Sequence, residues 1–354
     1  MAISQMWAVN GDNSGEKPEG VSAVYIANGD TSVSKPTGVS EVYAVNGNTS
    51  IPKPAGVSEI FLDGVDGTAP SGVSSVKVVN YSGNVLKDNT ILFKFTTGTY
   101  DPSLLTTLTG ATWTQISEDP NLWLWDASQV TDTDWSGAFR NKFTFPTEIM
   151  AAGKLTKPTV VGMSVTPYDG MFRSNNSLMR VNCVLDFPNA VNCSSLFQSN
   201  QNMTYVEGVK IPKAFTTQSM FRDCYSLEEV KSIETSNALT NVQQMFNSAG
   251  LKKQPPIFNT SKVSNFTSMF RGTSDSKNNF IEIPEYEYSS AETVDYMFEE
   301  CRKIESGIVS CYNKLSALPA VTADKYSYSR CFRNCGKDTT SGAAELAQIP
   351  NSWK

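Results

Sequence analysis

Residues 220–270 read MFRDCYSLEEVKSIETSNALTNVQQMFNSAGLKKQPPIFNTSKVSNFTSMF. A Met-Phe pair recurs in this stretch at 220–221, 245–246 and 269–270, at spacings of 25 and 24 residues. Outward from it, the same phase holds Met171-Phe172, Leu196-Phe197, Met297-Phe298 and Cys331-Phe332, so the successive steps are 25, 24, 25, 24, 28 and 34 residues. A regular period of this length indicates a repeat array.

Each copy predicts a coil with one very short strand. In each copy the aromatic residue is followed by a few polar residues and then by an apolar residue, such as Leu227. A second apolar residue, such as Val230, comes three positions after the first. One copy cannot bury these side chains alone, so the copies must stack into a solenoid. The predicted repeat core is Phe172, Phe197, Met220, Phe221, Met245, Phe246, Met269, Phe270, Met297, Phe298 and Phe332.

Three cysteines share one phase of the repeat. Cys224, Cys301 and Cys335 each lie three residues after the aromatic residue. A metal ladder would need CxxC pairs or histidines, and the sequence has neither. Because free cysteine behaves as a small apolar residue, we interpret these positions as core, and we expect no metal and no cofactor.

The segment FNTSKVSNFTSMF at 258–270 resembles the BspA-type leucine-rich repeats, whose copies read roughly F-D-T-S-x-V-T-N-M-x-x-M-F. The matching residues are Phe258, Thr260, Ser261, Val263, Asn265, Phe266, Met269 and Phe270. The resemblance covers residues 135 to 335 and is closest in the central copies. Such repeats occur in bacterial surface proteins and in some phage proteins, and the resemblance implies binding, not catalysis.

Composition excludes several classes of function. Of 354 residues, 18% are charged and 10% aromatic, which is typical of a folded protein. The net charge of -6 and the lack of a Lys/Arg cluster disfavour nucleic-acid binding. The absence of histidine excludes Ser-His-Asp and Cys-His catalysis, and we expect no enzyme. Seven cysteines without a bridging pattern fit folding in a reducing cytosol.

Acidic residues could in principle form a glycosidase site or a calcium site, and the sequence supports both only weakly. Carboxylate pairs suitable for glycoside hydrolysis occur at Glu118-Asp119, Asp132 with Asp134, Glu228-Glu229 and Glu299-Glu300, and we interpret them as solvated surface charge. The acidic turn DGVDG at 63–67 lacks the spacing of a dedicated calcium loop.

A second repeat is predicted to form a separate N-terminal region, residues 1–83. Gly20, Gly38, Gly56 and Gly72 end its units at steps of 18, 18 and 16 residues. Segments such as Val21-Ala23-Tyr25 and Val39-Glu41-Tyr43 alternate like strands, and Asn28-Gly29 and Asn46-Gly47 indicate tight turns. Units this small must pack on one another, on sister chains or on a partner. They are interpreted either as a small β-domain or stalk, or as a module for attachment or oligomerisation.

The remaining chain divides into two predicted regions. Residues 84–165 form a Trp-rich β linker or capping domain, in which residues 91–96 alternate like a strand and Phe139 starts a degenerate first coil. Four tryptophans crowd this region, and we interpret them as core in preference to a sugar-binding platform. Residues 166–354 form the solenoid with a C-terminal cap, and the insertions near 282–292 and 307–329 predict loops. The fold class is therefore mainly β with short irregular or helical segments.

The best candidates for surface binding are outward residues of the short strands, because side chains opposite the core repeat in register from coil to coil. These are Arg180, Thr204, Tyr205, Glu228 and Glu229. A phase error of one residue would invert this choice.

The features together favour a non-enzymatic phage virion fibre protein, of the head in preference to the tail. Residues 1–83 would attach it to capsid or tail proteins and support a homotrimer, and the solenoid would bind a bacterial surface glycan or protein. The first residues do not show the pattern of a signal peptide, and no apolar run is long enough to span a membrane. We therefore expect synthesis in the host cytoplasm without a signal peptide and a place on the virion surface. The alternatives are a bacterial cell-surface adhesin and, with less support, a polysaccharide depolymerase.

Overall fold

The computed structural model describes residues 25–28, 43–46, 86–95, 102, 105, 107–116, 120–132, 134–157, 168–272 and 278–354. The chain divides into two units, Met1–Val85 and Leu86–Lys354. The carboxylate pair Glu118-Asp119, the acidic turn at 63–67 and most of the N-terminal repeats lie outside the described residues. The division into regions 1–83, 84–165 and 166–354 stays a prediction.

In the first unit, strands β1 (Tyr25–Asn28) and β2 (Tyr43–Asn46) pair in parallel. Tyr25 lies opposite Tyr43 and Asn28 opposite Asn46. The offset of 18 residues equals the step from Gly20 to Gly38, so the repeat itself sets the register of the pair. The strands begin at the last residue of each expected segment. Because parallel strands need a longer crossover, no two-residue hairpin joins this pair.

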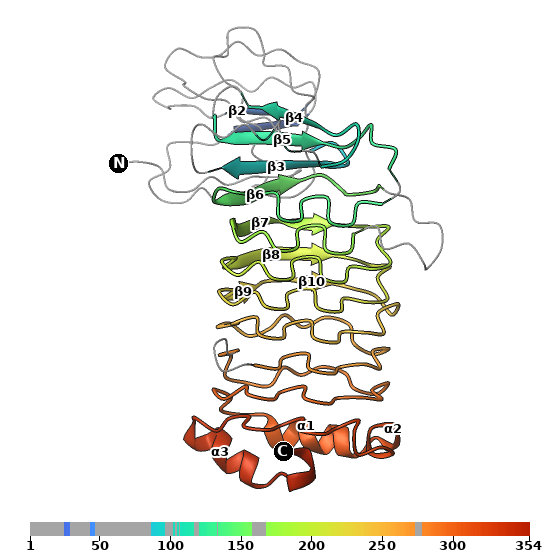
Figure 1. The fold of residues 1–354 in the computed structure, drawn as a ribbon, viewed down its shortest axis with the longest axis vertical. Helices are drawn as coiled ribbons and strands as arrows, with labels where there is room; N and C mark the ends of the chain where they lie inside the picture. The colour runs from blue at the N-terminus through green and yellow to red at the C-terminus, as the bar shows by residue number, and fades with distance from the viewer. Residues whose placement is uncertain are drawn as a thin grey trace. The chain divides into compact units, whose positions relative to one another are not determined.

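The second unit is built on one mixed sheet of eight strands in the described residues. The path runs β10-β8-β7-β6-β3-β5-β4, and β9 pairs with β8 (Figure 1). The strands are β3 (Thr90–Phe95), β4 (Thr112–Gln115), β5 (Leu122–Asp126), β6 (Thr147–Ala152), β7 (Leu178–Asp186), β8 (Tyr205–Lys210), β9 (Glu229–Val230) and β10 (Ile233–Glu234). Pairing is antiparallel from β4 to β6 and parallel from β6 onward.

The described residues contain three short helices. α1 (Ile308–Ser316) and α2 (Pro319–Thr322) lie before the last coil, and α3 (Thr340–Ala347) and the 3-10 turn η2 (Asn351–Trp353) follow it. The predicted class, mainly β with short helical segments, is confirmed. The prediction of a loop at 307–329 is wrong, because this insertion contains α1 and α2. Its spacing of Ile308, Cys311 and Leu315 places three apolar side chains on one buried helix face.

A column of phenylalanine rings runs through the coils. Successive rings lie 5.2–5.8 Å apart with interplanar angles of 1–10°. Phe139 is its first member, at 5.2 Å from Phe172, which confirms the degenerate first coil. The Met-Phe residues of the predicted core are all fully buried. The column is Phe139, Phe172, Phe197, Phe221, Phe246, Phe270, Phe298 and Phe332.

A residue with left-handed backbone geometry lies two positions before each ring and, except at Phe270, another lies two positions after it. Two residues before and two after Phe221, Ser219 and Asp223 have φ of 56° and 59°. Such φ values suit small or polar residues, which explains the polar runs beside the aromatic residue in each copy. The turn also aligns the backbone between coils, so that the N–H of Phe221 donates to the carbonyl of Met245 at 2.9 Å.

The position three residues after the ring satisfies carbonyls inside the stack. Asn175 is fully buried and donates to the carbonyls of Phe139 and Phe172 at 2.7 and 3.0 Å. The Cys224 thiol donates to the Phe197 carbonyl at 3.1 Å. Burial raises the pKa of Cys224 to about 12, so the sulfur keeps its proton. The three cysteines in this phase are therefore core residues, and Cys224 and Cys301 also donate hydrogen bonds to the preceding coil.

Both ends of the column are closed by aromatic side chains. At the start, Trp125 and Trp135 are fully buried, and Trp125 packs edge-on against Phe139 at 4.8 Å. At the other end, Trp353 lies 6.2 Å from Phe332, so the C-terminal tail acts as a cap. No helix of the described residues has the length and apolar character needed to cross a membrane.

Candidate binding face

The outer face of the parallel strands carries a continuous polar network across successive coils. The Arg180 guanidinium lies 4.5 Å from the centre of the Tyr205 ring, and its Nε donates to Asn182 at 3.2 Å. Asn182 in turn donates to Glu148 of β6 at 2.8 Å. The Tyr205 hydroxyl donates to Glu207, which pairs with Lys231 at 2.7 Å. We call Glu148, Arg180, Asn182, Tyr205, Glu207 and Lys231 the sheet-face network.

Strand alternation positions these side chains. Val181 and Val206 point into the core, so the residues on either side of each valine face outward. Parallel pairing places Arg180 opposite Tyr205 and Tyr205 opposite Glu229. Five members of the network are consequently held on the neighbouring strands β6, β7 and β8, and Lys231 lies between β9 and β10.

Within the sheet-face network, the acidic and basic side chains lie close enough to neutralise one another, as Glu207 and Lys231 do. The hydrogen bond from Lys231, followed by that from Tyr205, lowers the pKa of Glu207. Burial, followed by the hydrogen bond to Glu207, raises the pKa of Tyr205. At neutral pH the face therefore offers the carboxyl groups of Glu148 and Glu207, a protonated phenol, an amide and two cations, which suit hydroxyl-rich or peptide ligands.

The structure brings together some of the predicted binding residues and separates others. Arg180 and Tyr205 are in contact, and Glu229 lies beside them on β9. Thr204 precedes β8 and donates its hydroxyl to the Met179 carbonyl at 3.3 Å. Glu228 precedes β9 and pairs with Lys252. Thr204 and Glu228 thus lie outside the sheet-face network.

Sequence reasoning missed four members of the network: Glu148, Asn182, Glu207 and Lys231. Three of them lie two residues after a predicted position, because Asn182 follows Arg180, Glu207 follows Tyr205 and Lys231 follows Glu229. The sequence signal for these three residues is strand alternation, because residues two positions apart on a strand lie on the same face. Glu148 had no such signal, since β6 lies outside the regular copies.

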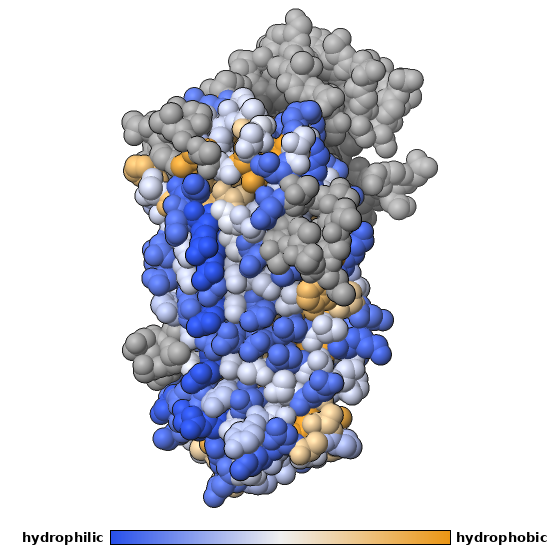
Figure 2. All heavy atoms as spheres, turned by 45° about the vertical axis from the view of Figure 1, so that its right-hand side comes forward, coloured by the Kyte–Doolittle hydropathy of each residue, from blue (hydrophilic) through white to orange (hydrophobic). Residues whose placement is uncertain are grey.

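The surface of the coils is otherwise mainly hydrophilic (Figure 2). Among the described residues, the large apolar side chains that stay exposed are scattered: Phe145, Tyr225, Ile257, Ile281 and Tyr326. Isolated exposed side chains of this kind are normal on a soluble surface. The polar face is therefore the better candidate for ligand contact.

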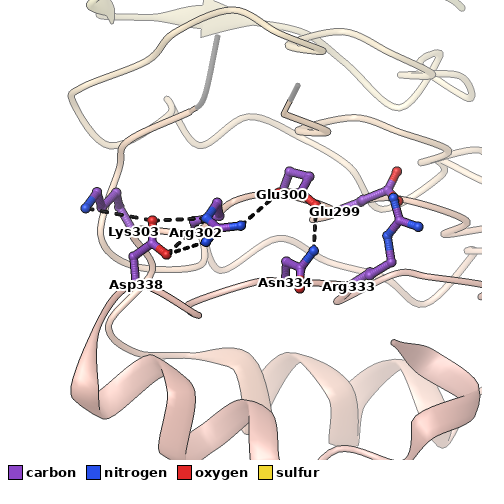
Figure 3. Close-up of polar contacts among 7 residues, drawn as sticks. All are labelled: Glu299, Glu300, Arg302, Lys303, Arg333, Asn334 and Asp338. Atoms are coloured by element: carbon purple, nitrogen blue, oxygen red, sulfur yellow. Dashed lines mark hydrogen bonds and ion pairs between the residues drawn. The ribbon is translucent and has the colours of Figure 1, made fainter. Parts of the chain in front are cut away.

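A second polar cluster joins the last two coils (Figure 3). The Arg302 guanidinium binds both carboxylate oxygens of Asp338 at 2.7–3.0 Å and lies 3.5 Å from Glu300. Asn334 donates to Glu300 at 2.6 Å. The backbone N–H of Asp338 also donates to the Arg302 carbonyl. These bonds link the coil of Phe298 to the cap, which is a structural role.

The remaining acidic residues in the described part of the chain make local contacts. Asp132 and Asp134 accept backbone N–H groups of Thr109 and Ser136. The prediction of solvated surface charge is wrong for Glu299, which is fully buried. Its burial is made possible by ion pairs with Arg271 and Arg333 on the neighbouring coils. In the described part of the chain, no three Cys, Asp or Glu residues are grouped to hold a metal ion.

Asp295 is expected to make stability depend on pH. Burial, and secondly the Glu299 charge, raise its pKa to about 6, while Arg330 and Arg271 act in the opposite direction. The folded protein then binds a proton more tightly than the unfolded chain, so stability falls as pH rises from about 4 to 6. Asp295→Asn should raise the free energy of unfolding at pH 7 by about 1 kcal/mol, after allowance for solvent screening of a half-exposed group.

Denaturant unfolding of both proteins at pH 4 and pH 7 checks this expectation. The gain should be present at pH 7 and absent at pH 4, where the wild-type carboxyl is protonated. An equal gain at both pH values would show that ionisation of Asp295 is not its cause.

Comparison with known proteins gives one finding. Residues 152–257 and 215–320 each match a family model described as Mycoplasma protein of unknown function, DUF285. The two matches overlap and together cover residues 152–320, the region of the stacked coils. They are consistent with a BspA-type repeat protein over this range. No curated protein and no solved structure matches the chain.

Proposed function

We propose that this chain is a non-enzymatic bacteriophage virion fibre protein whose BspA-type leucine-rich solenoid binds a glycan or protein of the bacterial surface. Head attachment is favoured over the tail, with residues 1–83 contacting capsid or tail proteins and supporting a homotrimer. The observation that carries the binding role is the sheet-face network, a polar surface fixed by the backbone of adjacent coils. Such rigid placement lowers the entropy cost of binding.

The attachment role is supported by the pairing of β1 with β2. Their offset of one repeat unit means that a unit can place its strand in register beside the next. Units of this kind can add strands to a partner or to a sister chain. A bacterial adhesin is the second candidate, because the matching family model is described from Mycoplasma.

The binding role is tested with the full chain and a matched pair of double variants. Arg180→Ala/Tyr205→Ala removes the cation–aromatic contact of the sheet-face network. Lys325→Ala/Tyr326→Ala removes a comparable pair, 5.1 Å apart, from the C-terminal cap. We expect the first variant to lose about tenfold or more in affinity for a panel of bacterial cells and cell-surface polysaccharides, and the second to bind like the wild type. Equal binding by both variants would exclude the sheet face as the binding surface.

The fibre setting is tested by size-exclusion chromatography with light scattering on the full chain and on residues 84–354. A trimer that becomes a monomer on truncation supports oligomerisation through the N-terminal repeats. A full chain that is monomeric would contradict the trimeric fibre.

A further inference from the structure

A row of side chains runs along the stack, one residue after each ring of the phenylalanine column. From Arg173 onward, the carbonyl of each row residue accepts an N–H from the preceding coil, as Arg222 does from Ser199 at 2.8 Å and Asn247 from Asp223 at 2.9 Å. The row positions are therefore aligned coil on coil. In order they hold Arg140, Arg173, Gln198, Arg222, Asn247, Arg271, Glu299 and Arg333.

Arginine occupies every second coil of this row from Arg173 onward. We call Arg173, Arg222, Arg271 and Arg333 the arginine row. Neighbouring members are separated by two ring steps, for example 5.4 and 5.5 Å between Phe172 and Phe221. The spacing of the arginines is thus a consequence of the repeat.

One interval of the arginine row already holds a carboxylate. Glu299 lies between Arg271 and Arg333, is fully buried, and pairs with both guanidinium groups, with Arg271 Nε at 2.5 Å. A single carboxylate can therefore bridge two arginines that are two coils apart. The protein itself displays the geometry in which this row binds an anionic group.

The other two intervals hold neutral amides. Gln198 lies between Arg173 and Arg222, and Asn247 between Arg222 and Arg271, and both amides are buried. Among the described residues, the buried Nε of Arg173 has no hydrogen-bond acceptor. The Arg222 Nε has an ion pair with Asp223 at 3.3 Å, and the Arg222 Nη1 donates to Gln244 at 3.1 Å. A buried donor without an acceptor costs free energy that a bound anion would recover.

Acidic side chains flank these arginines without filling the intervals. Asp223 lies 3.3 Å from Arg222 Nε and also faces Arg173, and Asp169 faces Arg173 and Arg140. Burial raises the pKa of both carboxyls. They reduce the local positive charge, so the row suits a ligand of low charge density.

We propose that the arginine row, at the intervals of Gln198 and Asn247, binds a linear acidic polysaccharide whose carboxylates are separated by neutral sugars. This inference rests on the proposed binding role of the solenoid and adds a ligand class to it. An extended chain lying along the stack would place successive carboxylates at the intervals, as Glu299 is placed between Arg271 and Arg333.

Charge spacing favours this polymer over nucleic acid. Duplex DNA carries a charge about every 1.7 Å of its axis, whereas the row offers one guanidinium for every two coils. Most phosphates would lack a cation and would face Asp169 and Asp223. The net charge of -6 adds a further repulsion.

The test measures binding of hyaluronate, in which a carboxylate sugar alternates with a neutral one, to the full-length protein. Neutral dextran and a DNA duplex serve as comparison ligands. Arg173→Gln/Arg222→Gln removes two cations of the row, and Lys253→Gln/Lys262→Gln removes two exposed cations elsewhere. We expect the arginine variant to lose about tenfold or more in affinity for hyaluronate and the lysine variant to keep it.

Gln198→Glu tests the same site without removing an arginine. It places a carboxylate between Arg173 and Arg222, as Glu299 stands between Arg271 and Arg333. We expect this variant to keep its melting temperature and to lose hyaluronate binding. Unchanged binding by Gln198→Glu, no binding by the wild type, or tighter binding of DNA would each overturn the inference. Sheet-face-dependent cell binding that persists in those cases would leave the proposed function in place.

Discussion

Phe246→Ala is expected to lower the free energy of unfolding by about 3–5 kcal/mol, as for other fully buried phenylalanines. Phe246 stacks on Phe221 at 5.3 Å and on Phe270 at 5.5 Å, so its removal opens a cavity between two coils. In a repeat array each coil is stabilised mainly by its two neighbours, so the substitution weakens the packing of the coils on both sides of Phe246. Chemical denaturation followed by circular dichroism measures the change.

Tyr326→Ala is the control for this substitution. Tyr326 is 68% exposed, and surface aromatic residues contribute little to stability. Its removal should change the free energy of unfolding by about 0.5 kcal/mol or less. If Phe246→Ala were as mild as Tyr326→Ala, the ring column would not be the core of the solenoid.

Asn175→Ala is expected to lower the free energy of unfolding by about 3–5 kcal/mol, because four backbone groups lose their partner and three of these bonds are buried. The side-chain oxygen accepts N–H groups from Lys142 and Phe143 at 2.9 and 3.1 Å. The amide nitrogen donates to the carbonyls of Phe139 and Phe172. The substitution also separates the first coil from the second, so hydrogen exchange should rise most at residues 139–143.

The neighbouring Asn176 provides a matched control. It is exposed, and its side chain accepts one N–H, from Gln201 at 3.2 Å. Asn176→Ala should cost about 1 kcal/mol or less, because water can replace that bond. Equal losses for Asn175→Ala and Asn176→Ala would contradict the assigned role of the buried amide.

The repeat pattern predicted the solenoid because the spacing of the aromatic residues is a local property of the chain. The same period predicted the buried Met-Phe positions. The echo of the repeat around Phe139 predicted the first coil, and the few apolar residues of the tail predicted its capping role. For the cysteines three positions after a ring, the sequence predicted burial but not hydrogen bonding. Apolar burial follows from composition, but the bond from Cys224 to Phe197 depends on the preceding coil.

The candidate binding faces were predicted less well. Arg180 and Tyr205 were selected as outward residues, and the structure places them in contact. The phase of each strand was uncertain by one residue, so Thr204 and Glu228 were selected with them. The arginine row was not recognised, because its members are spaced by two copies and share the row with amides and one acid.

The sequence by itself determined the coil length, the ring column and the mainly β class, since these depend on which residue type recurs at which step. Tertiary structure decided which polar side chains meet. Glu299 can be buried only because Arg271 and Arg333 lie on adjacent coils, and Tyr205 meets Arg180 only through the register of β7 and β8. Contacts between coils join residues about 25 positions apart, and their register is set by backbone pairing that no single copy contains.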